Sequence, residues 1–229
     1  MSDLLSCLNE PQKEAVLDFD HSLLVLAGAG SGKTRVITSK IVHALLEEGY
    51  RPWQILAVTF TNKAAREMRD RVESMLAPYS GIDISPLEIK TFHSYGAGLL
   101  RRYASAIGYP STFNIYDDSD SQSLFQSLYP ELDKASVRAY CKRISLLKDR
   151  GIGPDECEEE DLPLFRMRYK AYERKLRESQ CMDFADLIIR ANELLETDEE
   201  IRSYIRRRYR LILVDEYQDS NGSQFRLLK

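Results

Sequence analysis

Four short apolar, β-favouring runs stand out along the 229-residue chain, at Leu23–Leu26, Ile55–Thr61, Leu87–Phe92 and Leu211–Val214. The first, second and fourth are almost continuously apolar, which is typical of parallel strands that are buried on both faces. Stretches with helical periodicity separate the first three runs, and one of them is the amphipathic segment Val36–Leu46. This alternation predicts an α/β fold in which a parallel sheet is flanked by helices.

Residues 96–185 break this alternation. They are rich in Tyr, Arg, Glu and Leu at helical spacing, as in Lys134–Asp149 and Leu164–Glu178, and they contain few β-branched runs. Such a pattern indicates helices rather than strands. We therefore expect one domain that consists of residues 1–95 and 186–229 and carries the sheet, with residues 96–185 inserted in it as a helical subdomain.

Composition and charge narrow the class of protein. An apolar fraction of 43% and a charged fraction of 30% fit a globular chain, and no apolar run reaches the length of a membrane span. The N-terminus lacks the layout of a signal peptide. The cysteines Cys7, Cys141, Cys157 and Cys181 show no zinc or redox spacing, so we expect a protein of the reducing cytoplasm. A formal net charge of −4 disfavours nucleic-acid binding through bulk charge, although local phosphate contacts remain compatible with it.

The candidate chemistry begins directly after the first apolar run. There the chain reads Ala27-Gly28-Ala29-Gly30-Ser31-Gly32-Lys33-Thr34. A glycine-rich loop between a strand and a helix turns its backbone N–H groups toward phosphates. In such a loop Lys33 reaches the β- and γ-phosphates, and the Thr34 hydroxyl binds Mg²⁺. Ala27 stands where glycine is usual, but that position needs only a small residue. The alternative is a glycine-rich turn that ends in Lys-Thr by chance.

A pair of acids follows the last apolar run and matches the loop in chemistry. Asp215 can hold the Mg²⁺ that neutralises the phosphates, and Glu216 is placed to polarise an attacking water molecule. A strand that ends in two solvated acids is common in isolation. Together with a phosphate loop, however, the two acids predict the second half of an ATPase site.

These two segments and three others resemble the Rep, UvrD and PcrA group of superfamily 1 DNA helicases. Leu8–Gln12 is similar to the family's Q motif, Ala57–Ala65 to its motif Ia, and Thr91–Ser94 to its motif Ib. With Ala27–Thr34 and Asp215–Asn221 they occur in the family's order and extend over nearly the whole chain. The resemblance implies a RecA-like P-loop NTPase fold with an inserted helical subdomain.

The resemblance assigns roles in the nucleotide site. Gln12 would hydrogen-bond the adenine edge, because an amide both donates and accepts, and Arg35 would lay its planar guanidinium against the base. Gln12 is also the third helical residue of a capping box that starts at Asn9, and the two roles are compatible. Gln218 resembles the position that links the nucleotide state to the segments on the DNA side.

The resemblance also implies contacts with single-stranded DNA. Phe60 would stack on a base, a contact that contributes roughly 1–3 kcal/mol and tolerates any sequence. Core packing at a strand end is the alternative for this side chain. Thr61, Asn62 and Lys63 would contact backbone phosphates at a helix N-terminus. Thr91 and His93 would also contact the DNA backbone, and Phe184 is a further implied DNA contact.

The implied function is the first motor domain of an ATP-dependent DNA helicase or translocase that uses ATP and Mg²⁺. By resemblance it moves 3′-to-5′ on single-stranded DNA and at junctions of single- and double-stranded DNA. The oligomeric state stays open. Because the chain ends soon after its acidic motif, we expect an N-terminal fragment that lacks the second motor domain. Such a fragment would bind nucleotide, turn it over negligibly and not unwind DNA.

Two alternatives remain. One keeps the family and changes the task, to the motor subunit of a helicase–nuclease complex or to a translocase that does not unwind. The other is a small-molecule or nucleotide kinase. A kinase explains Lys33 and Asp215, but it leaves the segments around Gln12, Phe60 and His93 without a role.

Overall fold

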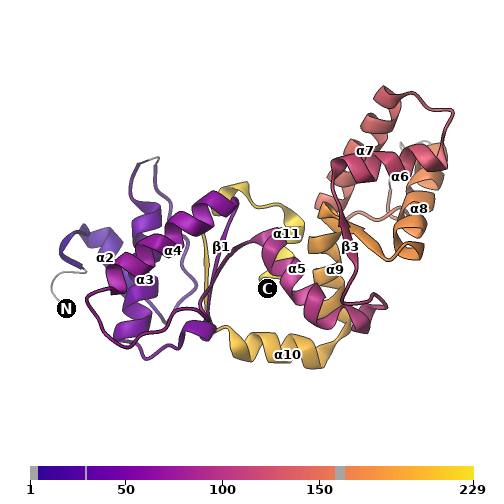
Figure 1. Cartoon of the computed structure of the whole chain (residues 1–229). Coiled ribbons are helices and arrows are strands. Elements are labelled where there is room, and N and C mark those ends of the chain that lie inside the picture. The colour runs from indigo at the N-terminus through magenta and orange to yellow at the C-terminus, as the bar shows by residue number, and fades with distance from the viewer. Residues whose placement is uncertain (1–4, 29, 158–162) are drawn as a thin grey trace. The chain divides into compact units, whose positions relative to one another are not determined.

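The structure is a computed structural model that describes residues 5–28, 30–157 and 163–229 (Figure 1). The chain forms two compact units. Unit 1 comprises Met1–Thr91 and Tyr204–Gln218, and unit 2 comprises Phe92–Ser203 and Asp219–Lys229. Within the described ranges, no helix has the length and apolar character needed to cross a membrane.

Unit 1 is built on a three-stranded parallel sheet with the order β2-β1-β5. The central strand β1 (Ile55–Thr59) pairs in parallel with β2 (Glu88–Thr91) and with β5 (Leu211–Val214). This parallel sheet with flanking helices confirms the predicted fold class. The helical elements are α2 (Glu10–Leu17), α3 (Lys33–Leu46), η1 (Pro52–Gln54), α4 (Asn62–Leu76) and η3 (Tyr217–Asp219), the last of which reaches past the end of unit 1.

The core of unit 1 lies between the sheet and the helices α3 and α4. All five residues of β1 are buried, and alternate residues such as Ile55 and Ala57 pack with Ile41 of α3 and Met68 of α4. The strand ends before the predicted Thr61, because the Thr61 side chain accepts a hydrogen bond from the Ala64 N–H and caps α4. The core therefore fixes the two loops that follow the ends of β1 and β5.

The predicted strand at Leu23–Leu26 is wrong. Its four side chains are 41–86% exposed, and the segment pairs with no strand in the part of the chain that the structure describes. A strand is stable only when its N–H and C=O groups pair with a neighbouring strand. Here the segment does not pair with β5; instead, it lines a cavity of about 670 Å³ together with α3 and β5. Because β5 is an edge strand, Ile212 is 40% exposed. Burial on both faces was therefore predicted correctly for β1 and wrongly for β5.

Unit 2 is mainly helical, and it also holds a short parallel pair, β3 (Asn114–Tyr116) with β4 (Cys181–Asp183), that the sequence pattern did not reveal. The helix expected at Lys134–Asp149 has those bounds, and the one expected from Leu164 begins one residue earlier. The helical elements are α5 (Phe92–Tyr103), η2 (Ala104–Ile107), α6 (Asp118–Leu128), α7 (Lys134–Asp149), α8 (Pro163–Glu178), α9 (Phe184–Thr197) and α11 (Gly222–Leu227), and α10 (Glu199–Arg208) continues from unit 2 into unit 1.

Helices α5 and α9 approach each other closely in unit 2. A Cβ atom at Gly96 would overlap the backbone carbonyl oxygen of Leu187, so only glycine fits there. Phe125 stacks on Tyr140 with 5.3 Å between ring centroids, in a core that also contains Phe165 and Tyr172. The functional division into residues 1–95 with 186–229 and residues 96–185 stays a prediction.

Candidate nucleotide and nucleic-acid sites

The glycine-rich loop ends at the N-terminus of α3. The structure describes this loop apart from Ala29. Gly30 and Gly32 have φ angles of +74° and +87°, a left-handed conformation that glycine adopts without strain. Gly32 is the N-cap of α3, and no side-chain cap satisfies the first N–H groups of this helix among the described residues. Free N–H groups at a helix N-terminus attract anions, phosphate included.

Gln12 connects α2 to this loop. Its Nε2 donates a hydrogen bond to the Ser31 carbonyl oxygen at 2.8 Å. Its Oε1 accepts from the Asn9 N–H at 3.0 Å, and the Asn9 side chain accepts from the Gln12 N–H at 3.0 Å, so the expected capping box is formed. A Cβ atom at Gly32 would lie 3.1 Å from Nε2, which makes glycine the best fit. The amide keeps one N–H and one lone pair for a further partner.

Arg35 lies on the exposed side of the first turn of α3. Its guanidinium donates a long hydrogen bond to the Cys7 carbonyl oxygen at 3.5 Å. Cys7 lies just before the Asn9 cap of α2, so Arg35 and Gln12 both reach the segment that leads into that helix. The adenine contact of either side chain stays a prediction.

Asp215 sits at the carboxyl end of β5. Its N–H donates to the Val58 carbonyl oxygen at 2.9 Å, which extends the pairing of β5 with β1 by one residue. The residue is 7% exposed, and its Oδ1 has no hydrogen-bond partner among the described residues. Burial raises the pKa of Asp215, the Glu216 carboxylate adds to this effect, and the Lys33 ammonium opposes it. A buried, unpartnered carboxylate oxygen of this kind suits a cation.

Glu216 brings the loop and the acidic segment together. Its Oε2 lies 3.6 Å from the Lys33 Nζ and accepts a hydrogen bond from the Gln218 Nε2 at 2.5 Å. Lys33 also donates to the Ala27 carbonyl oxygen at 3.3 Å. The backbone of Glu216 has φ +52°, which is uncommon for a residue other than glycine and typical of functional sites. Three of the four predicted catalytic residues therefore lie in direct contact.

The predicted DNA contacts of unit 1 follow β1 and end β2. Phe60 is half-buried after β1, whereas Asn62 and Lys63 are exposed in the first turn of α4. The Thr61 hydroxyl already serves as the cap of α4. Thr91 is only 6% exposed at the end of β2, which leaves its side chain little surface for a phosphate. The first turn of α4 is consequently the more accessible part of this region.

His93 and Phe184 form a second candidate region, in unit 2. Their ring centroids are 6.0 Å apart in an edge-to-face arrangement, and Phe184 is 51% exposed. Burial lowers the pKa of His93, and the Asp149 carboxylate opposes this shift. These two rings line one side of a cavity of about 600 Å³. The sequence analysis did not predict the residues on its other side, although an acidic capping box there indicates the start of a helix. That side consists of Asp117, Asp118 and Ser119.

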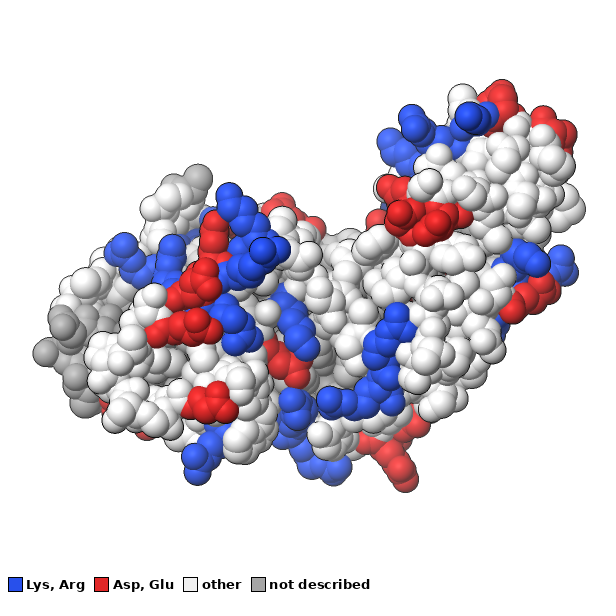
Figure 2. Space-filling model, viewed as in Figure 1, with Lys and Arg blue, Asp and Glu red and all other residues white. Residues whose placement is uncertain are grey.

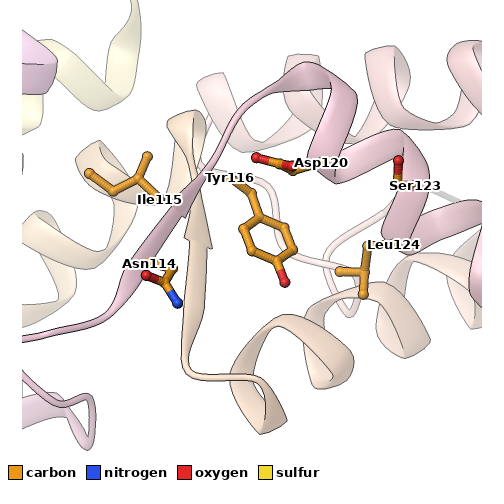
Figure 3. A pocket seen from close by; sticks show the side chains of 6 residues that line it. All are labelled: Asn114, Ile115, Tyr116, Asp120, Ser123 and Leu124. Carbon is orange, nitrogen blue, oxygen red and sulfur yellow. The ribbon is translucent and has the colours of Figure 1, made fainter.

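A further cavity of about 400 Å³ lies beside β3 in unit 2 (Figure 3). Its carboxylate, Asp120, already accepts a hydrogen bond from the Asp117 N–H in the cap of α6. Its lining residues are Asn114, Ile115, Tyr116, Asp120, Ser123 and Leu124.

Charged side chains of both signs are interspersed on the face shown in Figure 2. This mixture agrees with the formal net charge of −4. Any binding of nucleic acid at this face therefore depends on local contacts rather than on a broad positive field.

Comparison with known proteins identifies the family of the chain. Residues 8–229 match the sequence profile of the UvrD/REP helicase N-terminal domain. The chain belongs to this family. The match covers more than half of the chain and confirms the resemblance drawn from the five motifs.

Relatives of the UvrD/REP helicase N-terminal domain align along the whole chain. The ATP-dependent DNA helicase PcrA of Bacillus subtilis (strain 168) is 41% identical over 236 aligned positions, which cover 100% of this chain and 31% of the relative. The protein of the same name from Staphylococcus aureus (strain Mu50) is 36% identical over 237 positions, with 100% and 32% covered. The chain thus spans about a third of the length of the curated relatives it matches.

Proposed function

We propose that this chain is the ATP-binding first motor domain of an ATP-dependent DNA helicase or translocase. The observation that carries the proposal is the position of Glu216, which contacts both Lys33 and Gln218 and follows Asp215, a buried residue whose Oδ1 has no hydrogen-bond partner among the described residues. Membership of the UvrD/REP family and the names of the PcrA relatives support it.

The nucleotide would bind with its phosphates at the N-terminus of α3. The loop N–H groups and Lys33 would hold the triphosphate. Because a triphosphate carries more negative charge than one carboxylate, it would draw the Lys33 ammonium away from Glu216. Glu216 would then be free to polarise water, while Gln218 keeps its carboxylate oriented.

The donor set fits Mg²⁺, which prefers carboxylate and hydroxyl oxygens. Asp215 and Thr34 would hold the ion, and the bound ion supplies neutralisation of the phosphate charge. At the base, Gln12 would present its remaining N–H and lone pair to the adenine edge, and Arg35 would lie against the ring.

Single-stranded DNA, including its junctions with duplex, is the proposed track. Phe60 and Phe184 offer aromatic faces for bases, and Thr61, Asn62 and Lys63 offer groups at the start of α4 for phosphates. Thr91 and His93 are weaker candidates for backbone contacts.

A 3′-to-5′ direction and a cytoplasmic location complete the proposal, and the four free cysteines fit a reducing compartment. A subunit of a helicase–nuclease complex and a translocase that does not unwind are the alternatives within the family.

We expect the 229-residue chain by itself to bind nucleotide and to hydrolyse it negligibly. A second motor domain would supply arginines at the γ-phosphate, and such arginines contribute roughly 10³–10⁵ in rate in GTPases. About two-thirds of the length of each of these relatives is not covered by this chain. DNA-stimulated ATP hydrolysis by this chain alone would contradict the expectation.

The test is a titration of the chain with Mg·ATP, with and without single-stranded DNA. We expect saturable binding that is lost in Lys33→Ala and kept in Lys134→Ala. Lys134 is a suitable control because it is exposed on α7 of unit 2, whereas the phosphate loop belongs to unit 1. A shift of the ATP affinity with DNA would support the coupling of the two ligands. Equal binding by the wild type and Lys33→Ala would refute the nucleotide site.

A further inference from the structure

Lys40 is a buried charged residue of α3 that the proposed chemistry does not use. It is 8% exposed. Its Nζ donates hydrogen bonds to the carbonyl oxygens of Ala15 at 2.9 Å, Val16 at 3.5 Å and Asp18. The same Nζ lies 4.2 Å from the ring centroid of Phe19. One ammonium group thus gathers three carbonyl groups at the C-terminal end of α2.

Helix α2 needs such an anchor. It has eight residues, and a helix of that length is unstable in isolation. Its final carbonyl groups lack partners within the helix, and a cation there is favourable. The last turn of α2 contains no basic residue of its own. The apolar cluster beside α2 and α3 is small: its buried members are Leu8, Ala15, Val16 and Val36, and Leu5 packs against them. Lys40 therefore supplies from α3 the cation that α2 lacks.

The other end of α2 carries the amide that faces the phosphate loop. Gln12 lies in the first turn of α2 and donates to the Ser31 carbonyl oxygen, and Ala15 lies about one turn further on. Helix α2 is consequently fixed at both ends by one continuous element, the phosphate loop with α3. The phosphate-binding groups belong to that element itself, whereas Gln12 depends on the placement of α2.

We propose that Lys40 is a positioning residue for recognition of the base, which holds α2 so that Gln12 meets the adenine edge of the nucleotide. The proposal rests on the nucleotide site proposed above. It implies that loss of Lys40 weakens the contribution of the base to binding and leaves the contribution of the phosphates in place.

The experiment compares Mg·ATP, Mg·GTP and Mg·tripolyphosphate by calorimetric titration of the whole chain. For Lys40→Met we expect the Kd for ATP to rise about tenfold, the effect of losing one or two net hydrogen bonds. The Kd for tripolyphosphate should change less than about twofold, and the preference for ATP over GTP should shrink accordingly. Lys134→Met, which removes an exposed lysine on α7, is the matched control and should leave all three ligands unchanged.

A double-variant cycle separates positioning from a general effect on folding. If Lys40 acts through Gln12, the combined Lys40→Met and Gln12→Ala variant should bind ATP no more weakly than Gln12→Ala alone. Additive losses would overturn the proposal, and so would an equal weakening of ATP and tripolyphosphate or no change in either. If Lys40→Met loses its far-UV circular dichroism signal, Lys40→Gln, whose shorter and uncharged side chain lacks the ammonium, replaces it under the same criteria. A wild-type chain that binds neither ligand would overturn the nucleotide site as well, whereas normal wild-type binding with an unselective Lys40 effect would overturn only the role of Lys40.

Discussion

Replacement of Lys148 by methionine tests the buried charge cluster of unit 2. The Lys148 side chain is 1% exposed at the end of α7. Its Nζ lies 2.5 Å from Glu173 Oε1, 2.8 Å from Asp183 Oδ2 and 3.0 Å from Asp186 Oδ1. Three carboxylates thus converge on one ammonium.

The structure sets the expected size of the effect. Without Lys148, Arg190 still pairs with Glu173 at 2.8 Å and reaches Asp186 at 3.5 Å. Asp183 loses its only ion pair within the described residues and keeps the Tyr172 hydroxyl at 3.1 Å. Removal of one partner from a buried ion pair costs about 3–5 kcal/mol. We therefore expect Lys148→Met to lower the free energy of unfolding by about that amount at pH 8.

The loss should shrink at acid pH. Burial raises the pKa of Asp186 to about 7 even though Lys148 opposes it. Burial also acts to raise the pKa of Asp183, but the attraction and hydrogen bond of Lys148, together with hydrogen bonds from the Asp186 N–H and the Tyr172 hydroxyl, hold that pKa below its usual value. Without Lys148 both pKa values rise. A carboxyl group with a raised folded-state pKa destabilises the fold at high pH and loses that penalty on protonation. Lys148→Met should therefore be closer to the wild type at pH 5 than at pH 8.

Urea unfolding at pH 5 and pH 8, followed by near-UV circular dichroism of the tyrosines, measures both effects. Fluorescence of Trp53, the only tryptophan, reports on unit 1 in the same samples. The matched control Lys134→Met removes an exposed lysine from the same helix and should stay within about 0.5 kcal/mol of the wild type. A loss for Lys148→Met below about 1 kcal/mol, or an equal loss at both pH values, would refute the reasoning.

Two further predictions concern exposed apolar side chains. Phe184→Ala should weaken single-stranded DNA binding by roughly 1–3 kcal/mol in an anisotropy titration and leave Mg·ATP affinity unchanged. Tyr204, 41% exposed on α10, provides the aromatic control, and an equal loss in Tyr204→Ala would argue against stacking on Phe184. Leu26→Lys should reduce concentration-dependent self-association in sedimentation velocity, because Leu26 is 86% exposed and lines the same cavity as the edge strand β5. A wild-type chain that stays monomeric at high concentration would contradict this.

The sequence predicted correctly those elements of the fold that are determined by residues close together in the chain. The apolar run of β1 predicts where a strand lies, and the capping box at Asn9 predicts where a helix starts. The run Leu23–Leu26 has the same apolar character as β1, but it lacks a neighbouring strand in the described chain. Composition alone does not distinguish the two cases, because strand pairing depends on segments that are distant in the sequence.

The sequence predicted which residues belong to the candidate nucleotide site, but it did not predict which of them contact one another. The spacing of the glycine-rich loop and the position of two acids after an apolar strand indicated Lys33, Asp215 and Glu216. Glu216 contacts both Lys33 and Gln218 with its backbone at a positive φ, and no pattern in the sequence predicts that angle. Local strain of this kind is set by the surrounding structure rather than by the residue.

The two buried lysines do have a sequence signal, which is their place on an otherwise apolar helix stripe. Lys40 lies between the buried residues Val36 and Ala44 at four-residue spacing, and Lys148 follows the buried Ile144 by the same interval. A lysine on such a stripe either extends its charge to solvent or requires buried acceptors. Carbonyl groups of α2 satisfy one lysine, and carboxylates of α8 and the β4–α9 segment satisfy the other. Each lysine thus joins its own helix to a segment that carries a candidate ligand contact, Gln12 in one case and Phe184 in the other. Substitution of either lysine should therefore impair the ligand contact on the segment it holds more than the contacts elsewhere.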